Sequence, residues 1–119
     1  MYHLSTNSVQ KPLPEKDCLK ICIMRRVKPE FDFDLWLPHL SPSTELLQKY
    51  QEENLSWEEF KEEFLKETKD KEKYYSLIEH LLTFSDVSIL CWEETSEACH
   101  RKIVGEILEK KLGIKVNFD

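Results

Sequence analysis

The stretch Val87–Cys91, "VSILC", restricts the possible folds of this chain more than any other part of it. These five residues, mostly apolar, stand between one amphipathic helical pattern and another that begins near Ser96. A run this short and this apolar is typical of a buried strand. Strands that alternate with helices build parallel sheets, so this part of the chain predicts an α/β fold.

Two more strands are expected, one before this run and one after it. Cys18–Val27 alternates between two faces and contains several β-branched residues, which favours a strand. Ile114–Phe118 follows Gly113, a residue suited to the left-handed position that stops a helix. The sequence thus predicts an α/β fold: a small single domain with a short, mostly parallel sheet flanked by helices.

The remaining apolar residues recur mainly at helical spacing. One helix is expected after Ser41 or Ser43, either of which can cap it. The next is marked by Ser56 and Glu59, which have the spacing of a capping box. Asp32–Leu40 is expected to form a short helix or a turn.

The start of the chain differs in composition from the rest. Residues 1–17 are polar and contain Pro12 and Pro14. We expect them to form an irregular lead-in, followed by a single α/β domain over residues 18–119. A chain of 119 residues has the length of one ordinary domain.

The charge and composition restrict the partners of the protein. The net charge is −6, and no region is basic enough to contact the many phosphates of a duplex. We therefore do not expect duplex nucleic acid as a partner, whereas a small anionic ligand or nucleotide fits one local basic point. Only two glycines are present, which excludes a glycine-rich phosphate loop. Without a signal peptide or a membrane-spanning stretch, we expect a cytoplasmic protein that does not enter a membrane.

The residues after Val87–Cys91 form the candidate site. Ligands of α/β sheets bind where strands end, and the next helix begins there with Cys99, His100 and Arg101. The positive end of a helix attracts anions and lowers the pKa of a cysteine. Arg101 offers a bidentate donor, and His100 offers a general base or a partner for a thiolate.

Each of these residues also has a structural interpretation. His100 falls near the middle of the apolar stripe of its helix, where a histidine is often a buried, hydrogen-bonded linker. Cys99 fits a small core residue, and Arg101 fits a partner for a nearby glutamate. Glu93 is either a second acid or base or a solvated loop residue.

The four cysteines allow two further interpretations. Together with His100 they are soft metal ligands, but the short Cys-x-x-Cys motif of structural zinc sites is absent. Residues i and i+4 of a strand stand about 13 Å apart, too far for Cys18 and Cys22 to share an ion. We therefore predict no metal and no cofactor. A redox pair of Cys91 and Cys99 stays open, although the apolar run suggests that Cys91 is buried.

Several short motifs, taken in order, resemble a known family. "DLWL", "LSPS", Trp57 with Phe60, "ILCWE" and "CHR" are similar to the signature of domain of unknown function 488, over roughly residues 19 to 112. An arginine follows the first strand in that family, and Arg26 takes this place here. The resemblance implies a compact α/β fold and no established reaction. It also implies a group at one sheet edge, made of Arg26, Cys91, Glu93, Cys99, His100 and Arg101 and flanked by Asp34, Trp36 and Ser43.

Our leading hypothesis is an α/β protein with an anion- or nucleotide-sized pocket where Val87–Cys91 meets the next helix. The candidate anion-binding residues are Arg26 and Arg101. The candidate catalytic residues are Cys99, His100 and Glu93, and whether a reaction follows binding is open. One alternative is a thiol-dependent enzyme or redox protein that uses Cys99 with Cys91. The other is a non-catalytic interaction module.

Overall fold

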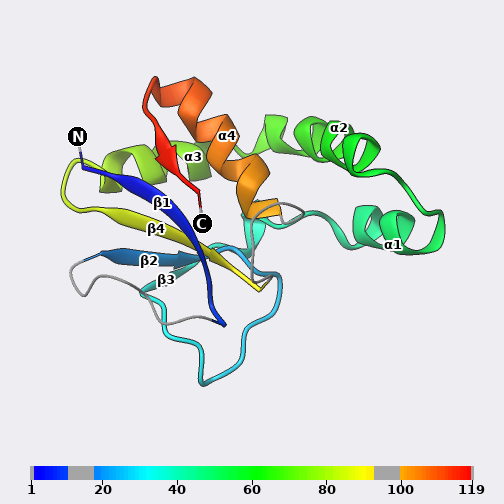
Figure 1. Cartoon of the computed structure of the whole chain (residues 1–119), viewed down its shortest axis with the longest axis horizontal. Helices are drawn as coiled ribbons and strands as arrows, with labels where there is room; N and C mark the ends of the chain where they lie inside the picture. Colours follow the sequence, from blue (N-terminus) through cyan, green and yellow to red (C-terminus); the bar gives the residue numbers. More distant parts are fainter. Residues whose placement is uncertain (1, 11–17, 93–99, 119) are drawn as a thin grey trace.

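The centre of the protein is a parallel sheet (Figure 1). The structure is a computed structural model, and it describes residues 2–10, 18–92 and 100–118. Within these residues five strands lie in the order β3-β2-β4-β1-β5, each parallel to its neighbours. The strands are β1 (Leu4–Ser8), β2 (Leu19–Cys22), β3 (Leu35–Trp36), β4 (Val87–Cys91) and β5 (Val116–Asn117). The prediction of a small α/β domain with a short parallel sheet is confirmed.

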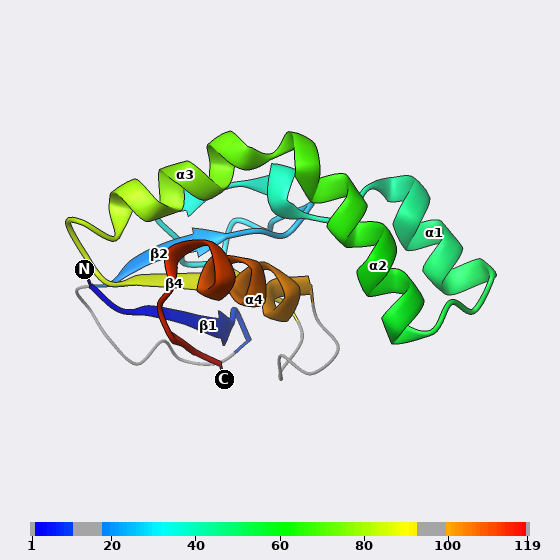
Figure 2. The ribbon, with the colours of Figure 1, turned by 90° about the horizontal axis from the view of Figure 1, so that it is seen from above.

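The helices take two positions relative to this sheet. They are α1 (Thr44–Glu52), α2 (Trp57–Glu67), α3 (Glu72–Leu81) and α4 (His100–Leu112), with short 3-10 turns η1 (Pro38–Leu40) and η2 (Thr68–Asp70). α3 and α4 cover one face of the sheet, whereas α1 and α2 form a hairpin that projects beyond its edge (Figure 1 and Figure 2). None of the helices in the described ranges is long and apolar enough to span a bilayer.

The hydrophobic core lies between the sheet and these two covering helices. Alternate residues of each central strand are fully buried there, such as Ile21 and Ile89, and they meet Ile78 and Val104 from the helices. The opposite face of the sheet is more polar, because Asn7 and Ser88 lie on it and their side chains form a hydrogen bond. One face therefore supplies most of the packing energy.

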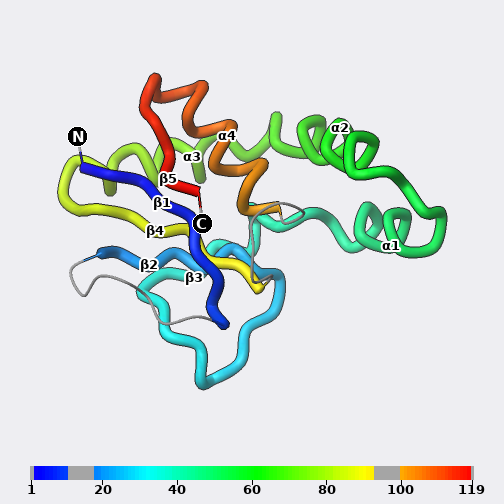
Figure 3. The backbone as a smooth tube through the Cα atoms, in the orientation of Figure 1, coloured from blue at the N-terminus to red at the C-terminus, as the bar shows by residue number. Residues whose placement is uncertain are grey.

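The expected irregular lead-in over residues 1–17 is wrong at Leu4–Ser8, which form β1. This strand lies between β4 and β5, and Leu4 is paired with both Val87 and Val116; Figure 3 shows β5 beside it near the C-terminus. Thr6 and Ser8 are buried although they are polar, so apolar alternation does not reveal the strand. Its hydrogen-bonding partners are distant in sequence, and the domain begins before residue 18.

Two other boundaries differ from the prediction. The strand expected over Cys18–Val27 is only four residues long, Leu19–Cys22. The short helix or turn expected over Asp32–Leu40 is replaced in part by β3, a two-residue strand paired with β2. The turn itself is present as η1, immediately before α1.

The local signals for helix ends are confirmed. Ser43, the second of the two predicted caps, accepts a hydrogen bond from the backbone N–H of Leu46. Ser56 and Glu59 form the reciprocal capping box at the start of α2. Gly113 follows α4 with a φ of +64°, the left-handed conformation that glycine adopts without strain.

Candidate functional site

The carboxyl ends of β2 and β4 lie side by side at a point where the chain direction divides. From β2 the chain continues to β3, toward one edge of the sheet. From β4 it continues to β5, at the opposite edge. Ligands of open α/β sheets bind in the crevice that forms at such a switch point. The residues after these two strands are therefore the first place to look for a site.

His100 fills this crevice. Its Nε2 lies 3.1 Å from the carbonyl oxygen of Ile23, and its two ring nitrogens lie 3.5 and 3.6 Å from Cys91 Sγ. A carbonyl oxygen can only accept, so Nε2 donates to Ile23, and the sulfur of Cys91 lies against the edge of the ring. The ring also meets the edge of Phe64, with centroids 6.2 Å apart. We call this group the His100 junction. It consists of Ile23, Phe64, Cys91 and His100, together with the adjoining Arg101.

Within the junction, Cys91 and Arg101 are enclosed by the rest of the domain, whereas His100 is partly exposed. Cys91 is 3% exposed and Arg101 is 0% exposed. A charged guanidinium in such a place is retained only when surrounding groups compensate it. The junction therefore has the geometry of a polar connection between α4 and the two strands β2 and β4.

The other predicted site residues are dispersed or undescribed. Arg26 is exposed and lines a separate shallow hollow with Phe31 and Trp92. The structure does not place Arg26 and Arg101 on one cavity within its described ranges, and Glu93 and Cys99 lie outside those ranges. Arg26 and Arg101 as a pair of anion-binding residues therefore stay a prediction.

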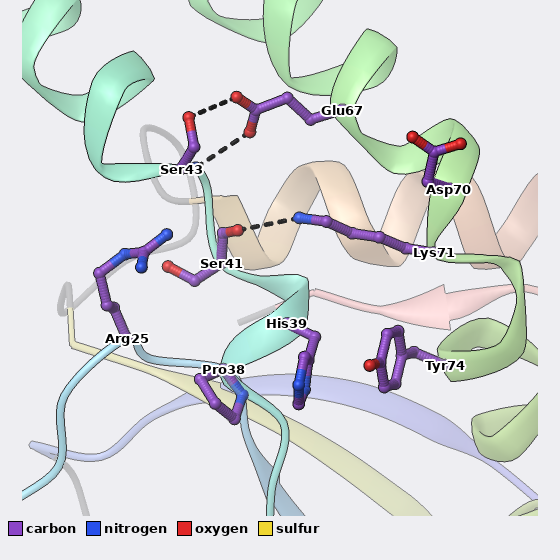
Figure 4. A pocket seen from close by; sticks show the side chains of 9 residues that line it. All are labelled: Arg25, Pro38, His39, Ser41, Ser43, Glu67, Asp70, Lys71 and Tyr74. Carbon is purple, nitrogen blue, oxygen red and sulfur yellow. Dashed lines mark hydrogen bonds between the residues drawn. The ribbon is translucent and has the colours of Figure 1, made fainter.

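A wider groove opens beside the junction, and Figure 4 shows it from close by. Its volume is about 650 Å³, within the range of small-molecule sites. Three segments supply its walls: the chain shortly after the end of β2, the chain that follows β3, and the connection from α2 to α3. The lining residues are Arg25, Pro38, His39, Ser41, Ser43, Glu67, Asp70, Lys71 and Tyr74.

Ser43 and Glu67 close the upper end of this groove. The backbone N–H of Ser43 donates to Glu67 Oε1 at 2.9 Å, and Ser43 Oγ donates to Glu67 Oε2 at 2.5 Å. Ser43 begins α1 and Glu67 ends α2, so the two contacts hold the base of the projecting hairpin. Both carboxylate oxygens are thereby engaged within the protein.

Arg25 and Lys71 reach the same backbone segment from opposite sides, as Figure 4 shows. Arg25 Nη2 donates to the carbonyl oxygen of Pro42 at 2.6 Å. Lys71 Nζ donates to that of Ser41 at 3.1 Å. A guanidinium has five N–H donors and an ammonium has three, so both keep donors for a ligand.

An aromatic pair forms another wall of the groove. The rings of His39 and Tyr74 stack with centroids 4.4 Å apart and an interplanar angle of 12°. His39 is exposed and Tyr74 is half-buried. Flat ligand rings are commonly held on surfaces of this kind.

Most of these groove residues were not singled out by the sequence. Ser43 was expected to flank the site, and Arg25 is the neighbour of the predicted Arg26. Glu67 and Lys71 belong to a charged stretch whose regular pattern gives no sign of a cavity. Asp34 and Trp36 have structural contacts, since Asp34 Oδ2 accepts from the backbone of Lys20 and Trp36 Nε1 donates to the carbonyl of Met24.

No group of three or more histidine, cysteine, aspartate or glutamate residues converges in the described ranges in a way that could hold an ion. Cys22 is buried, and burial raises the pKa of its thiol, although a hydrogen bond from the backbone of Met24 opposes the shift.

Comparison with known proteins identifies the family. Residues 4–112 match the family described as the Active DUF488-N3 subclade. No curated protein and no solved structure matches the chain. The matched region begins at β1 and runs to the end of α4, so it contains the sheet edge, the His100 junction and the groove. The chain belongs to the DUF488 family, in its DUF488-N3a group.

Proposed function

We propose that this protein binds a small anionic compound, up to the size of a nucleotide, in the groove beside the carboxyl ends of β2 and β3. The observation that carries the proposal is the arrangement of Arg25 and Lys71. Two cationic side chains line one open groove of about 650 Å³. Each of them donates one described hydrogen bond to a backbone carbonyl.

The acidic residues of the groove leave this role open to the cations. Both oxygens of Glu67 accept hydrogen bonds from Ser43, and its charge acts on Lys71 without an ion-pair contact. Asp70 is exposed at the rim, where solvent screens its charge. A phosphate or carboxylate between Arg25 and Lys71 would therefore gain charge-assisted hydrogen bonds.

The stacked rings of His39 and Tyr74 favour a ligand that also carries a flat ring. A nucleotide combines an aromatic base with a phosphate, and both parts have a counterpart in the groove. Stacking on an aromatic side chain contributes about 1–3 kcal/mol per base in known complexes. This is why a nucleotide is the first ligand to test.

Thiol chemistry is the second proposal, and the contact between Cys91 Sγ and His100 favours it. In this alternative Cys99 is the nucleophile or redox thiol, His100 the base and Glu93 a second acid or base. An interaction module is the third proposal, and the hairpin of α1 and α2, which projects from the sheet, is its natural surface (Figure 2). We rank both below anion binding, because Cys91 is enclosed and the hairpin alone indicates no partner.

Titration calorimetry at low salt tests the binding proposal, with adenosine 5′-monophosphate, adenosine and inorganic phosphate as probes. We expect the monophosphate to bind more tightly than adenosine. Arg25→Gln should weaken its binding about tenfold or more, because a hydrogen bond to a charged group is lost.

Arg26→Gln is the matched control, because it removes the same charge from the next residue, outside the groove. Equal losses in both variants, or no loss in Arg25→Gln, would contradict the proposal. Binding that depends on Arg26 alone would instead support the pair predicted from the sequence.

A further inference from the structure

Lys71 differs from the four lysines that the structure pairs with carboxylates. Lys20, Lys61, Lys66 and Lys111 each lie within ion-pair distance of a carboxylate. Within the described ranges, no carboxylate is that close to the ammonium of Lys71. Its one hydrogen-bond acceptor there is the backbone carbonyl of Ser41.

The surroundings of Lys71 disfavour a positive charge. Its side chain is half-buried, and its Nζ lies 5.7 Å from the ring centroid of Phe64. Arg25 points toward the same backbone segment from the opposite wall (Figure 4). Burial lowers the pKa of the Lys71 ammonium; the Glu67 carboxylate opposes the shift and the Arg25 guanidinium adds to it.

This combination is the one that makes a lysine nucleophilic. A free amine attacks carbonyl carbons, and a protonated one does not. Desolvation and a neighbouring cation both increase the fraction of free amine at a given pH. Because Lys71 lines an open groove, a ligand can reach its amine.

We propose that Lys71 is a reactive amine that forms an imine with an aldehyde or ketone whose phosphate or carboxylate is held by Arg25. The Lys71 nitrogen adds to the carbonyl carbon, and the carbinolamine then loses water to give the C=N bond. The ammonium proton leaves to solvent, which fills the open groove. No oxidant or reductant is needed for this step.

The inference rests on the proposed anion site, since Arg25 supplies the charge that positions the carbonyl. It adds the class of ligand: a carbonyl compound that carries an anionic group. It also assigns different tasks to two residues, because Arg25 binds the anion and Lys71 forms the covalent bond.

Reductive trapping on the full chain tests the proposal. The protein is mixed with pyridoxal 5′-phosphate, which combines a flat ring, a phosphate and an aldehyde, and is then treated with borohydride. Peptide mass spectrometry locates the reduced adduct. We expect Lys71 to carry several-fold more label than its exposed neighbours Lys69 and Lys73, because more of its amine is free at the same pH.

Two related probes distinguish a failure of the imine proposal from a failure of the anion-binding proposal. Pyridoxine 5′-phosphate has an alcohol in place of the aldehyde, so it should protect Lys71 without labelling it. Pyridoxal lacks the phosphate and should label Lys71 much less. If Lys71 reacts no faster than Lys69 and Lys73, the imine is refuted, even where pyridoxine 5′-phosphate still binds through Arg25. If pyridoxal labels Lys71 as well as the phosphate ester does, the assignment of an anionic ligand is refuted.

Lys71→Arg tests whether the imine forms at Lys71 and not at another lysine. Arginine keeps the positive charge and a donor for Ser41, so the fold should persist, and circular dichroism verifies it. The variant should lose most of the imine absorbance while it retains binding of pyridoxine 5′-phosphate. Imine absorbance that is undiminished in Lys71→Arg would overturn the assignment of the reactive amine to this residue.

Discussion

The His100 junction and the groove share one edge of the sheet but use polar residues in opposite ways. At the junction, His100 directs its ring nitrogens to a backbone carbonyl and a buried thiol, and Arg101 is completely enclosed. In the groove, Arg25 and Lys71 each satisfy one backbone carbonyl and keep further donors at an open surface. His100 and Arg101, two of the residues singled out from the sequence, thus lie among residues of the fold, whereas Arg25 and Lys71 line an open cavity.

This difference teaches that burial decides what a polar side chain can do. An enclosed polar group has to be satisfied by the protein itself, and its removal leaves the partners unpaired. A group on a cavity wall can exchange water for a ligand at small cost. The two regions should therefore respond differently to the same kind of substitution.

The largest contrast is expected between two arginines. Arg101→Ala should lower the free energy of unfolding by about 3–5 kcal/mol, because the groups that compensate the buried guanidinium lose their partner. Arg25→Ala should change it by less than about 1 kcal/mol, because Arg25 is exposed. Urea unfolding followed by circular dichroism measures both. Equal effects would remove the distinction between the two regions.

His100 gives the second contrast. His100→Ala leaves the buried carbonyl of Ile23 without its donor and should cost about 1–3 kcal/mol of unfolding free energy. Binding of adenosine 5′-monophosphate should remain, since the described walls of the groove do not include His100. A folded His100→Ala protein that no longer binds the monophosphate would place the site at the junction.

The same variant tests the thiol proposal. If His100 activates Cys99, alkylation of Cys99 by iodoacetamide should be slower in His100→Ala than in the unchanged protein. An unchanged rate would leave His100 with the structural role that its hydrogen bonds describe. Cys22→Ser serves as the matched control, because it changes another buried residue at the end of β2 and leaves His100 in place.

The sequence predicted those parts of the fold that local patterns determine. The apolar run at β4, the capping box at Ser56 and the stop at Gly113 are each encoded by neighbouring residues. β1 could not be predicted in this way, because four of its five residues are polar and its place in the sheet depends on pairing with β4 and β5. Secondary structure set by distant partners leaves no periodic signal.

The candidate site follows the same division. The sheet edge that carries the groove was predictable, because ligands of α/β proteins bind at the carboxyl ends of strands. Which arginine points into the groove was not, since Arg25 and Arg26 are adjacent and identical in type. Lys71 reaches Ser41 across thirty residues of sequence, and only the folded chain brings the two together.

The smallest expected effect concerns the pH dependence of stability at the groove. Burial holds the pKa of Lys71 below its ordinary value of 10.5 in the folded protein. As the pH rises toward 10.5, the folded state therefore loses this proton before the unfolded state does. The unfolded state then binds more protons, so the contribution of Lys71 to the free energy of unfolding increases with pH in that window.

Lys71→Met isolates this contribution from those of the other lysines and the tyrosines. The stability of the unchanged protein relative to Lys71→Met should be lowest below the folded-state pKa, where the half-buried ammonium is charged. It should then rise as the pH approaches 10.5. The lost hydrogen bond to Ser41 changes the difference in unfolding free energy between the two proteins by the same amount at every pH, so it does not change the slope of that difference against pH. Urea unfolding of both proteins at several alkaline pH values gives the slope. A flat or falling difference would mean that the Lys71 ammonium is as well solvated as an exposed lysine, and the reactive amine would lose its physical basis.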